Sequence, residues 1–291
     1  MNPSPEHGLY RQAAEMTSCG AHATSFDALP RDPAGLAEVI QGVLLHEHWA
    51  SAYGVTLTDA RRSESHIRPV EEMLDRLSAR HQRPLLAARP VDERVVGVCR
   101  HFTALLVAML RRFDTPARAR CGFGAYFEPG RFVDHWVCEY WNDAGERWQL
   151  VDAQIDALQS SKLTIDFDLL DVPRDRFLVA GDAWVQCSSG SADPSRFGIH
   201  DMHGLWFIAG NVLRDLAALN NMEMLPWDVW GPMVLADEPL DAASLALFDR
   251  IAELTRAPDA SVAELQEVYS DETLRVPAVV WNAVLNREDR L

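Results

Sequence analysis

The stretch VVGVCRHFTALLVAML, residues 95–110, predicts a helix with a cysteine at its start. Its apolar residues recur at the three-four spacing of a helix with one buried face, as Phe102, Leu105 and Met109 illustrate. Cys99 opens this predicted helix, two positions before His101. A cysteine in that place is either a small packing residue or a nucleophile that the helix start activates.

The start of a helix favours a thiolate for a physical reason. Unpaired backbone N–H groups and the positive end of the helix dipole stabilise negative charge there and lower the pKa of a thiol. Arg100 adds a positive charge beside Cys99. His101 is rotated by about 200° around the helix from Cys99, so we expect it on the outer side and not as a catalytic base. Taken alone, Cys99 favours the packing interpretation, because inert buried cysteines are the commoner case.

Two strand-like runs follow, DHWVCEYW (134–141) and RWQLVDAQ (147–154), separated by the turn-forming residues NDAG (142–145). If those four residues form the hairpin loop, counting back along both strands places His135 directly opposite Asp152. Opposed residues have β-carbons about 5 Å apart, close enough for an imidazole to donate a hydrogen bond to a carboxylate.

This register supplies the partners that a cysteine nucleophile needs. Cys99 would attack, His135 would act as base and acid, and Asp152 would hold the imidazole in one tautomer. The prediction depends on the register, because a slip of one residue would send the two side chains to opposite faces.

These residues also carry a resemblance to a known family. The segments GVCRHFTALLVAMLRRFDTPARARCGFGAYF, DHWVCEYW and RWQLVDAQ, in this order, resemble the transglutaminase-like superfamily of papain-like cysteine enzymes. The resemblance covers roughly residues 94–156 and implies the roles just given for Cys99, His135 and Asp152. The turn FDTPAR departs from the family pattern, which usually has glycine and isoleucine there.

The resemblance and the periodicity together predict an α+β fold. We expect a papain-like core, in which the helix bearing the cysteine packs on an antiparallel sheet, with flanking N-terminal and C-terminal helices. The expected organisation is an N-terminal arm (1–34), a transglutaminase-like catalytic core (35–175) and a mainly helical C-terminal extension (176–291). Further helices are expected over residues 33–54, 63–81, 201–221, 241–257 and 261–275.

The expected activity is cysteine-dependent acyl transfer on an amide or peptide-like bond through a thioester on Cys99, with hydrolysis favoured. Transfer of the acyl group to an amine, as in a transglutaminase or an amide synthase, is the alternative. A catalytically idle domain that binds a peptide in the same cleft is a further one. The backbone N–H of Cys99 is the first oxyanion donor we would name, and the sequence assigns no second one.

Composition limits the other classes of function. The formal net charge of −16 argues against nucleic acids and anionic membranes as partners, since both attract clustered lysine and arginine. No secretory signal and no run of about 18 apolar residues is found, which predicts a soluble, cytoplasmic protein. The five cysteines are odd in number and lack a CxxC pair, so neither a disulfide framework nor a zinc knuckle is expected.

Other polar and aromatic groups have weaker functional interpretations. Trp136, Trp227 and Trp230 are candidate substrate-binding residues, although packing is the favoured role of the last two. LHEHW (45–49) and IHDMH (199–203) each contain a pair of histidines. The first pair lacks metal-ligand spacing, and the second lacks a third and fourth ligand nearby. In the second, Asp201 is expected to cap a helix. We therefore expect no metal and no cofactor, and the oligomeric state is not predicted.

Overall fold

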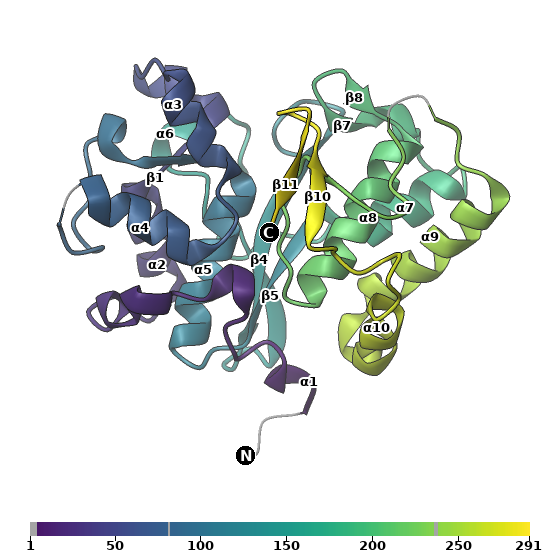
Figure 1. Ribbon diagram of the computed structural model, residues 1–291, viewed down its shortest axis with the longest axis horizontal. Helices are drawn as coiled ribbons and strands as arrows, with labels where there is room; N and C mark the ends of the chain where they lie inside the picture. Colours follow the sequence, from purple (N-terminus) through teal and green to yellow (C-terminus); the bar gives the residue numbers. More distant parts are fainter. Residues whose placement is uncertain (1–4, 81, 236–237) are drawn as a thin grey trace. The chain divides into compact units, whose positions relative to one another are not determined.

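The computed structural model describes residues 5–80, 82–235 and 238–291 (Figure 1). Its internal contacts divide the chain into two compact units. Unit 1 comprises residues 1–119 and 137–172, and unit 2 comprises residues 120–136 and 173–291. The described residues form helices and strands in both units, so the predicted α+β class is confirmed.

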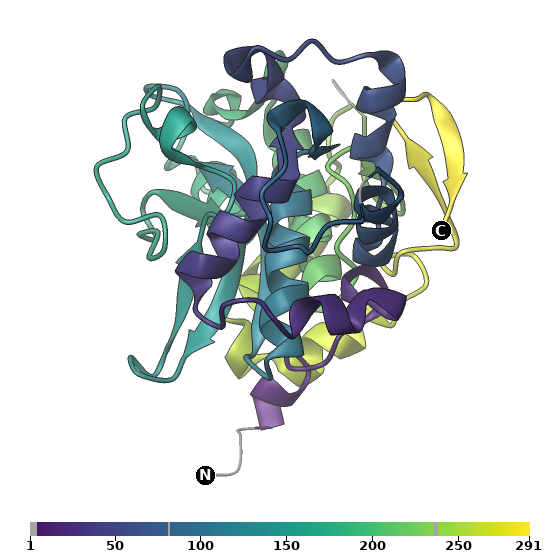
Figure 2. The ribbon, with the colours of Figure 1, turned by 90° about the vertical axis from the view of Figure 1, so that its left-hand side faces the viewer.

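Unit 1 is built around helix α5 (Cys99–Arg112), whose side chains are buried from Cys99 to Arg111. Helices α2 (Pro33–Val43) and α4 (Val70–Arg80) pack against it. These helices can be followed by their colours in Figure 2. The predicted helix at Cys99 is thereby confirmed, but it is enclosed on every side rather than amphipathic.

The predicted continuous helix over 33–54 is wrong: the α-helix ends at Val43, and a 3₁₀-helix occupies Glu47–Tyr53. Beyond Val43 the chain becomes extended as β1 (Leu44–His46), which pairs in parallel with β2 (Val95–Gly97). His46 is the partner of Gly97, so this pairing brings a distant segment beside the strand that leads to Cys99. A parallel pairing between segments so far apart in sequence leaves no local signal. The helical periodicity therefore predicted a helix that continues through these residues.

The strands of the main sheet run in the order β6-β3-β4-β7-β8, with β5 paired to β4. Their bounds are β3 Ala117–Gly124, β4 Phe132–Asn142, β5 Arg147–Val151, β6 Phe177–Val179, β7 Phe197–Ile199 and β8 Met202–His203. β3 and β4 each pass from one unit into the other within the strand. No loop therefore separates the units at these two crossings.

Strand β3 is buried on both of its faces, so its arginines need internal partners. In unit 1, Arg118 Nε lies 2.6 Å from Glu139 Oε2, and its guanidinium stacks 3.8 Å from the ring centre of Trp148. In unit 2, Arg120 binds both carboxylate oxygens of Asp215, at 3.1 and 2.8 Å. A planar guanidinium suits such paired contacts, which explains how two cations occupy one interior strand.

Unit 2 contains helices that pack on one another, α7 with α8 and α9, and α8 with α9. Their bounds are α7 Ala180–Ser188, α8 Leu205–Leu219, α9 Ala242–Arg256 and α10 Val262–Tyr269. The predicted helix over 241–257 is confirmed. That over 201–221 begins four residues late, because β8 precedes it, and Asp201 lies in the β7–β8 turn and caps no helix.

The remaining elements are short. A second sheet in unit 2 has the order β11-β10-β9, from β9 Asp228–Val229, β10 Val279–Asn282 and β11 Arg287–Arg290. The short α-helices of unit 1 are α1 Pro5–Gly8, α3 Asp59–Arg62 and α6 Ala157–Ser160. Tyr10, Met16 and Phe26 of the predicted N-terminal arm are buried. Across the described ranges, every helix is too short or too polar to cross a membrane.

Candidate active site

Cys99 is the first residue of α5, as the sequence predicts. The preceding residue, Val98, has extended backbone angles and is the N-cap of the helix. The Cys99 side chain is only 6% exposed. Cys99 therefore lies at the N-terminal end of the helix, where the backbone N–H groups lack partners within the helix. The rest of the helix is held in place by burial.

His101 is fully buried, so its predicted place on the outer side of the helix is wrong. Its ring Nδ1 accepts a hydrogen bond of 3.1 Å from the backbone N–H of Val98, and its backbone N–H donates to the Val98 carbonyl at 2.8 Å. An imidazole at the third helical position thus replaces the usual carboxylate or amide of a capping box. Burial above all, and then the charge of Arg100, lowers the pKa of His101 to about 3.

Gly97 makes the space that this histidine occupies. A β-carbon at Gly97 would lie 2.7 Å from Cγ of His101, too close for any side chain. Gly97 and His101 are therefore one device that closes the first turn of α5. The sequence carried a signal for this cap. A glycine directly precedes the N-cap, and a polar residue follows three positions after it.

The β4–β5 hairpin has a register two residues away from the predicted one. Asn142 pairs with Arg147, so the loop consists of residues 143–146 rather than 142–145. Both predicted strands are confirmed. The error lies in the position of the loop, since Asn142 belongs to the first strand and Glu146 to the loop.

The predicted direct opposition of His135 and Asp152 is consequently wrong. Cys138 pairs with Val151, and the same register continued by one pair sets Asp152 opposite Val137. A shift of two residues, unlike a shift of one, leaves each side chain on the face that was predicted for it.

Asp152 directly follows β5 and is buried. Its Oδ1 accepts a hydrogen bond of 3.0 Å from the backbone N–H of Gln154, and its own N–H donates to the carbonyl of Leu169 at 2.9 Å. The carboxylate is therefore held at the start of a turn that follows the strand.

His135 lies on β4, in the part of the strand that belongs to unit 2. It is 2% exposed and stands edge-on to three aromatic rings: Phe127 at 4.7 Å between ring centres, Tyr126 at 5.9 Å and Phe177 at 6.3 Å. These rings confine the imidazole from several directions. Cys99 and Asp152 are described within unit 1, and the triad of the three residues stays a prediction.

A buried polar network fixes the strand immediately before His135. Asp134 Oδ1 accepts a hydrogen bond of 2.7 Å from Asn211 on α8, and Arg214 donates to the amide oxygen of Asn211 at 3.1 Å. Burial raises the pKa of Asp134, while the charge of Arg214 acts in the opposite direction. The network ties β4 to the most buried helix of unit 2.

The candidate substrate-binding tryptophans lie at different depths. Trp136 and Trp230 are buried, and the indole N–H of Trp230 donates to the Leu274 carbonyl at 3.0 Å. Trp227 is half-buried. Contact of any of the three with a substrate stays a prediction.

The histidine pairs do not extend into ligand sets in the part of the chain that the structure describes. No group of three or more histidine, cysteine, aspartate or glutamate side chains there could hold a metal ion. His46 Nδ1 accepts a hydrogen bond of 3.3 Å from the backbone N–H of His48, which gives that ring nitrogen a local role at the end of β1.

A comparison with protein families shows which family one segment of the chain resembles. Residues 54–153 match the model of the transglutaminase-like superfamily. The resemblance is confirmed for this transglutaminase-like segment, which contains Cys99, His135 and Asp152. No curated protein and no solved structure gave a significant match to the chain.

Proposed function

We propose that this chain is a cysteine-dependent enzyme that cleaves an amide or peptide-like bond through a thioester on Cys99, with water as the acyl acceptor. Cys99 is the nucleophile, His135 the general base and acid, and Asp152 the residue that orients His135. All three lie in the transglutaminase-like segment, whose superfamily is typically one of cysteine hydrolases and acyltransferases.

The observation that carries the proposal is the place of Cys99 as the first residue of α5. The positive end of the helix dipole favours a thiolate there. The backbone N–H of Cys99 is also the first donor to a negatively charged oxygen that develops next to the sulfur. A helix enclosed along its length holds both groups in place without reorganisation during the reaction.

The reaction proceeds in two stages. The Cys99 thiolate attacks the amide carbon, a C–S bond forms, and the carbonyl oxygen takes the negative charge. The C–N bond then breaks while protonated His135 gives its proton to the departing amine. In the second stage His135 takes a proton from water, the hydroxide attacks the thioester, the C–S bond breaks, and the carboxylic acid leaves.

His101 does not serve as the base in this scheme. Its Nδ1 is engaged as an acceptor from the helix backbone, and a pKa of about 3 makes the imidazole too weak a base to take up a proton near neutral pH. The role of base and acid therefore passes to His135.

Alkylation at pH 6 with iodoacetamide tests the nucleophile. Cys187 is the matched control, because it is 7% exposed against 6% for Cys99, and burial raises the pKa of its thiol to about 11. We expect Cys99 to be labelled at least about tenfold faster than Cys187, as peptide mass spectrometry would show. Equal rates would overturn the proposal, and His135→Ala is expected to slow the labelling of Cys99.

The acyl acceptor is tested with p-nitrophenyl acetate, an activated ester that acylates thiolates. In the presence of excess methylamine, hydrolysis yields acetate, whereas transfer yields N-methylacetamide. We expect acetate to predominate and Cys99→Ala to abolish the release of p-nitrophenol above background. A predominance of N-methylacetamide would assign the enzyme to acyl transfer instead.

A further inference from the structure

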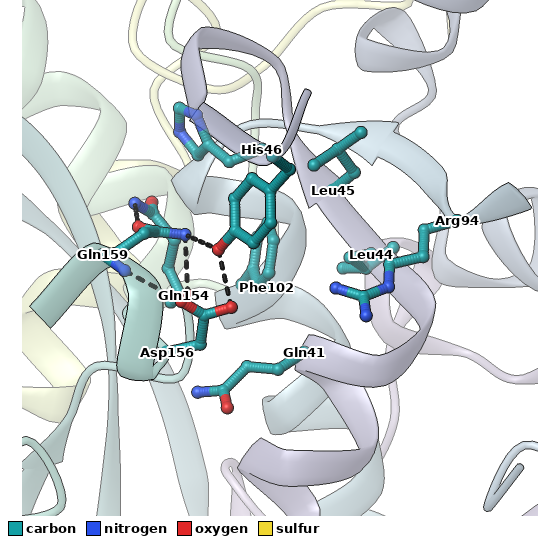
Figure 3. Close-up of a pocket in the computed structure, with 10 residues that line it drawn as sticks. Gln41, Leu44, Leu45, His46, Arg94, Phe102, Gln154, Asp156 and Gln159 are labelled. Carbon is teal, nitrogen blue, oxygen red and sulfur yellow. Dashed lines mark hydrogen bonds between the residues drawn. The ribbon is translucent and has the colours of Figure 1, made fainter. Parts of the chain in front are cut away.

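The loop that carries Asp152 is tied down by side chains from three elements of unit 1. These side chains line a small pocket (Figure 3), to which α2, the 3₁₀-helix η3 (Glu47–Tyr53) and α6 contribute. Figure 3 shows Gln41, Gln154, Asp156 and Gln159 gathered around this pocket. The hydrogen bonds of Asp156, Gln159 and Gln154 form a chain through Tyr53 that ends at the Asp152 carboxylate, and Gln41 holds the same loop separately.

Gln41 holds the backbone of the loop from α2. Its Nε2 lies 3.2 Å from the carbonyl oxygen of Ala153 and 3.3 Å from that of Ile155, the first and third residues after Asp152. One amide group thus fixes two peptide planes of a loop that has no strand partner of its own.

Tyr53 holds the far end of the same loop. Its hydroxyl donates a hydrogen bond of 2.6 Å to Asp156 Oδ2 and accepts one of 3.2 Å from Gln159 Nε2. Asp156 uses its other oxygen to cap α6, accepting from two backbone N–H groups at 3.0 Å. Burial and the hydrogen bond to Asp156 raise the pKa of Tyr53, so the hydroxyl keeps its proton and remains a donor.

Gln154 connects these anchors to Asp152. Its backbone N–H donates to Asp152 Oδ1 at 3.0 Å. Its carbonyl accepts from Gln159 Nε2 at 3.3 Å, and its own Nε2 donates to Gln159 Oε1 at 3.0 Å. The peptide group that fixes the Asp152 carboxylate is therefore fixed in turn by Gln159, which Tyr53 contacts directly.

We propose that Tyr53 and Gln41 are positioning residues for the Asp152 carboxylate. The inference rests on the proposed function, in which Asp152 orients His135. Both residues precede the transglutaminase-like segment, so the device comes from the N-terminal elements of this chain and not from the matched core. A displacement of about 1 Å at a catalytic group can cost up to about a hundredfold in rate, so support of the loop matters for turnover.

Tyr53→Phe tests the inference, with Tyr140→Phe as its control. Both tyrosines are half-buried, but Tyr140 lies on the β4–β5 hairpin, away from the loop anchors. With p-nitrophenyl acetate, we expect Tyr53→Phe to lower kcat about tenfold, with KM changed less, and Tyr140→Phe to leave kcat unchanged. Gln41→Met removes the amide at nearly constant length and is expected to lower kcat in the same way, which keeps the test valid if one variant folds poorly.

A double-mutant cycle separates positioning from a purely structural role. In an Asp152→Ala background, Tyr53→Phe should have no further effect on the residual rate, because its influence passes through Asp152. Equal proportional losses in both backgrounds would overturn the inference, as would a Tyr53→Phe rate equal to that of Tyr140→Phe. Full activity of Asp152→Ala alone would instead refute the role that the proposed function gives to Asp152, and the inference would fail with it.

Discussion

The start of α5 and the middle of β4 each bury a histidine, and the two are held in different ways. His101 is fully buried with Nδ1 bonded to the backbone of its own helix. His135 is nearly as buried, but the rings of Tyr126, Phe127 and Phe177 surround it. Burial alone therefore does not assign a role to an imidazole, whereas the hydrogen bond that Nδ1 of His101 accepts identifies a structural one.

The difference also reverses what closeness in sequence suggests. His101 lies two positions from Cys99, yet it serves the geometry of the helix start. His135 lies 36 positions away and is the residue to which we assign proton transfer. Three measurements would break or sharpen this comparison.

The largest effect on kcat/KM is expected when each of the two histidines is substituted in turn. His135→Ala should lower kcat/KM for p-nitrophenyl acetate by about 10³–10⁴, because the general base and acid is lost. His101→Asn, which keeps an acceptor for the Val98 N–H, should change it less than about tenfold. The reverse order of the two variants would contradict the comparison.

A second, smaller effect concerns stability against pH. His101 has a pKa of about 3 when folded, below the roughly 6.5 of an unfolded histidine, so between these values the unfolded chain binds a proton that the folded chain does not. The free energy of unfolding should therefore fall as pH decreases from about 6.5, by up to about 1.4 kcal/mol per pH unit from this group. Urea unfolding at pH 4.5 to 7 should show a shallower dependence for His101→Asn. Parallel curves for the two proteins would exclude this contribution.

The smallest effect is expected at the rings around His135. Phe127 is half-buried and closest to the imidazole, so Phe127→Ala should admit bulkier acyl groups. We expect the rate ratio of p-nitrophenyl butyrate to acetate to rise about two- to tenfold. Phe132→Ala is the matched control, because Phe132 is also half-buried but stacks on Phe197 instead. An unchanged ratio in Phe127→Ala would remove the ring from the substrate path.

Elements with strong local patterns could be predicted from the sequence. Helix α5 and helix α9 carry long apolar periodicities, and both are found where expected. The strand β1 could not be predicted, because its extended form depends on pairing with β2, about fifty residues later. Helix α7 was missed altogether, a nine-residue element with a weak pattern of its own.

The hairpin register was missed for a specific local reason. Asn142 remains in the strand, while its side-chain oxygen accepts from the N–H groups of Ala144 and Gly145. Glu146 takes the left-handed conformation, with φ of 48°, that composition would assign to the neighbouring glycine. The loop therefore lies one residue later in the sequence than the position of Gly145 suggests. As a result, each residue of β4 pairs with a residue of β5 two positions later than predicted.

The sequence suggested the residue types of the candidate site, whose roles stay predictions, but not the contacts that support them. Cys99, His135 and Asp152 follow from motif order and the helix start. The capping role of His101 and the anchors Gln41 and Tyr53 depend on contacts that no local pattern encodes.

The passage of β3 and β4 between the units bears on how a shortened product of this gene would behave. A polypeptide ending near residue 172 would keep the whole transglutaminase-like segment. It would nevertheless lack Asp215, which neutralises Arg120, and Asn211, which binds Asp134 beside His135. An unpaired buried charge of this kind costs several kcal/mol, commonly about 3–5. The segment is thus contiguous in the gene without being self-sufficient as a protein, and a truncating allele is expected to abolish the whole product rather than release an active half.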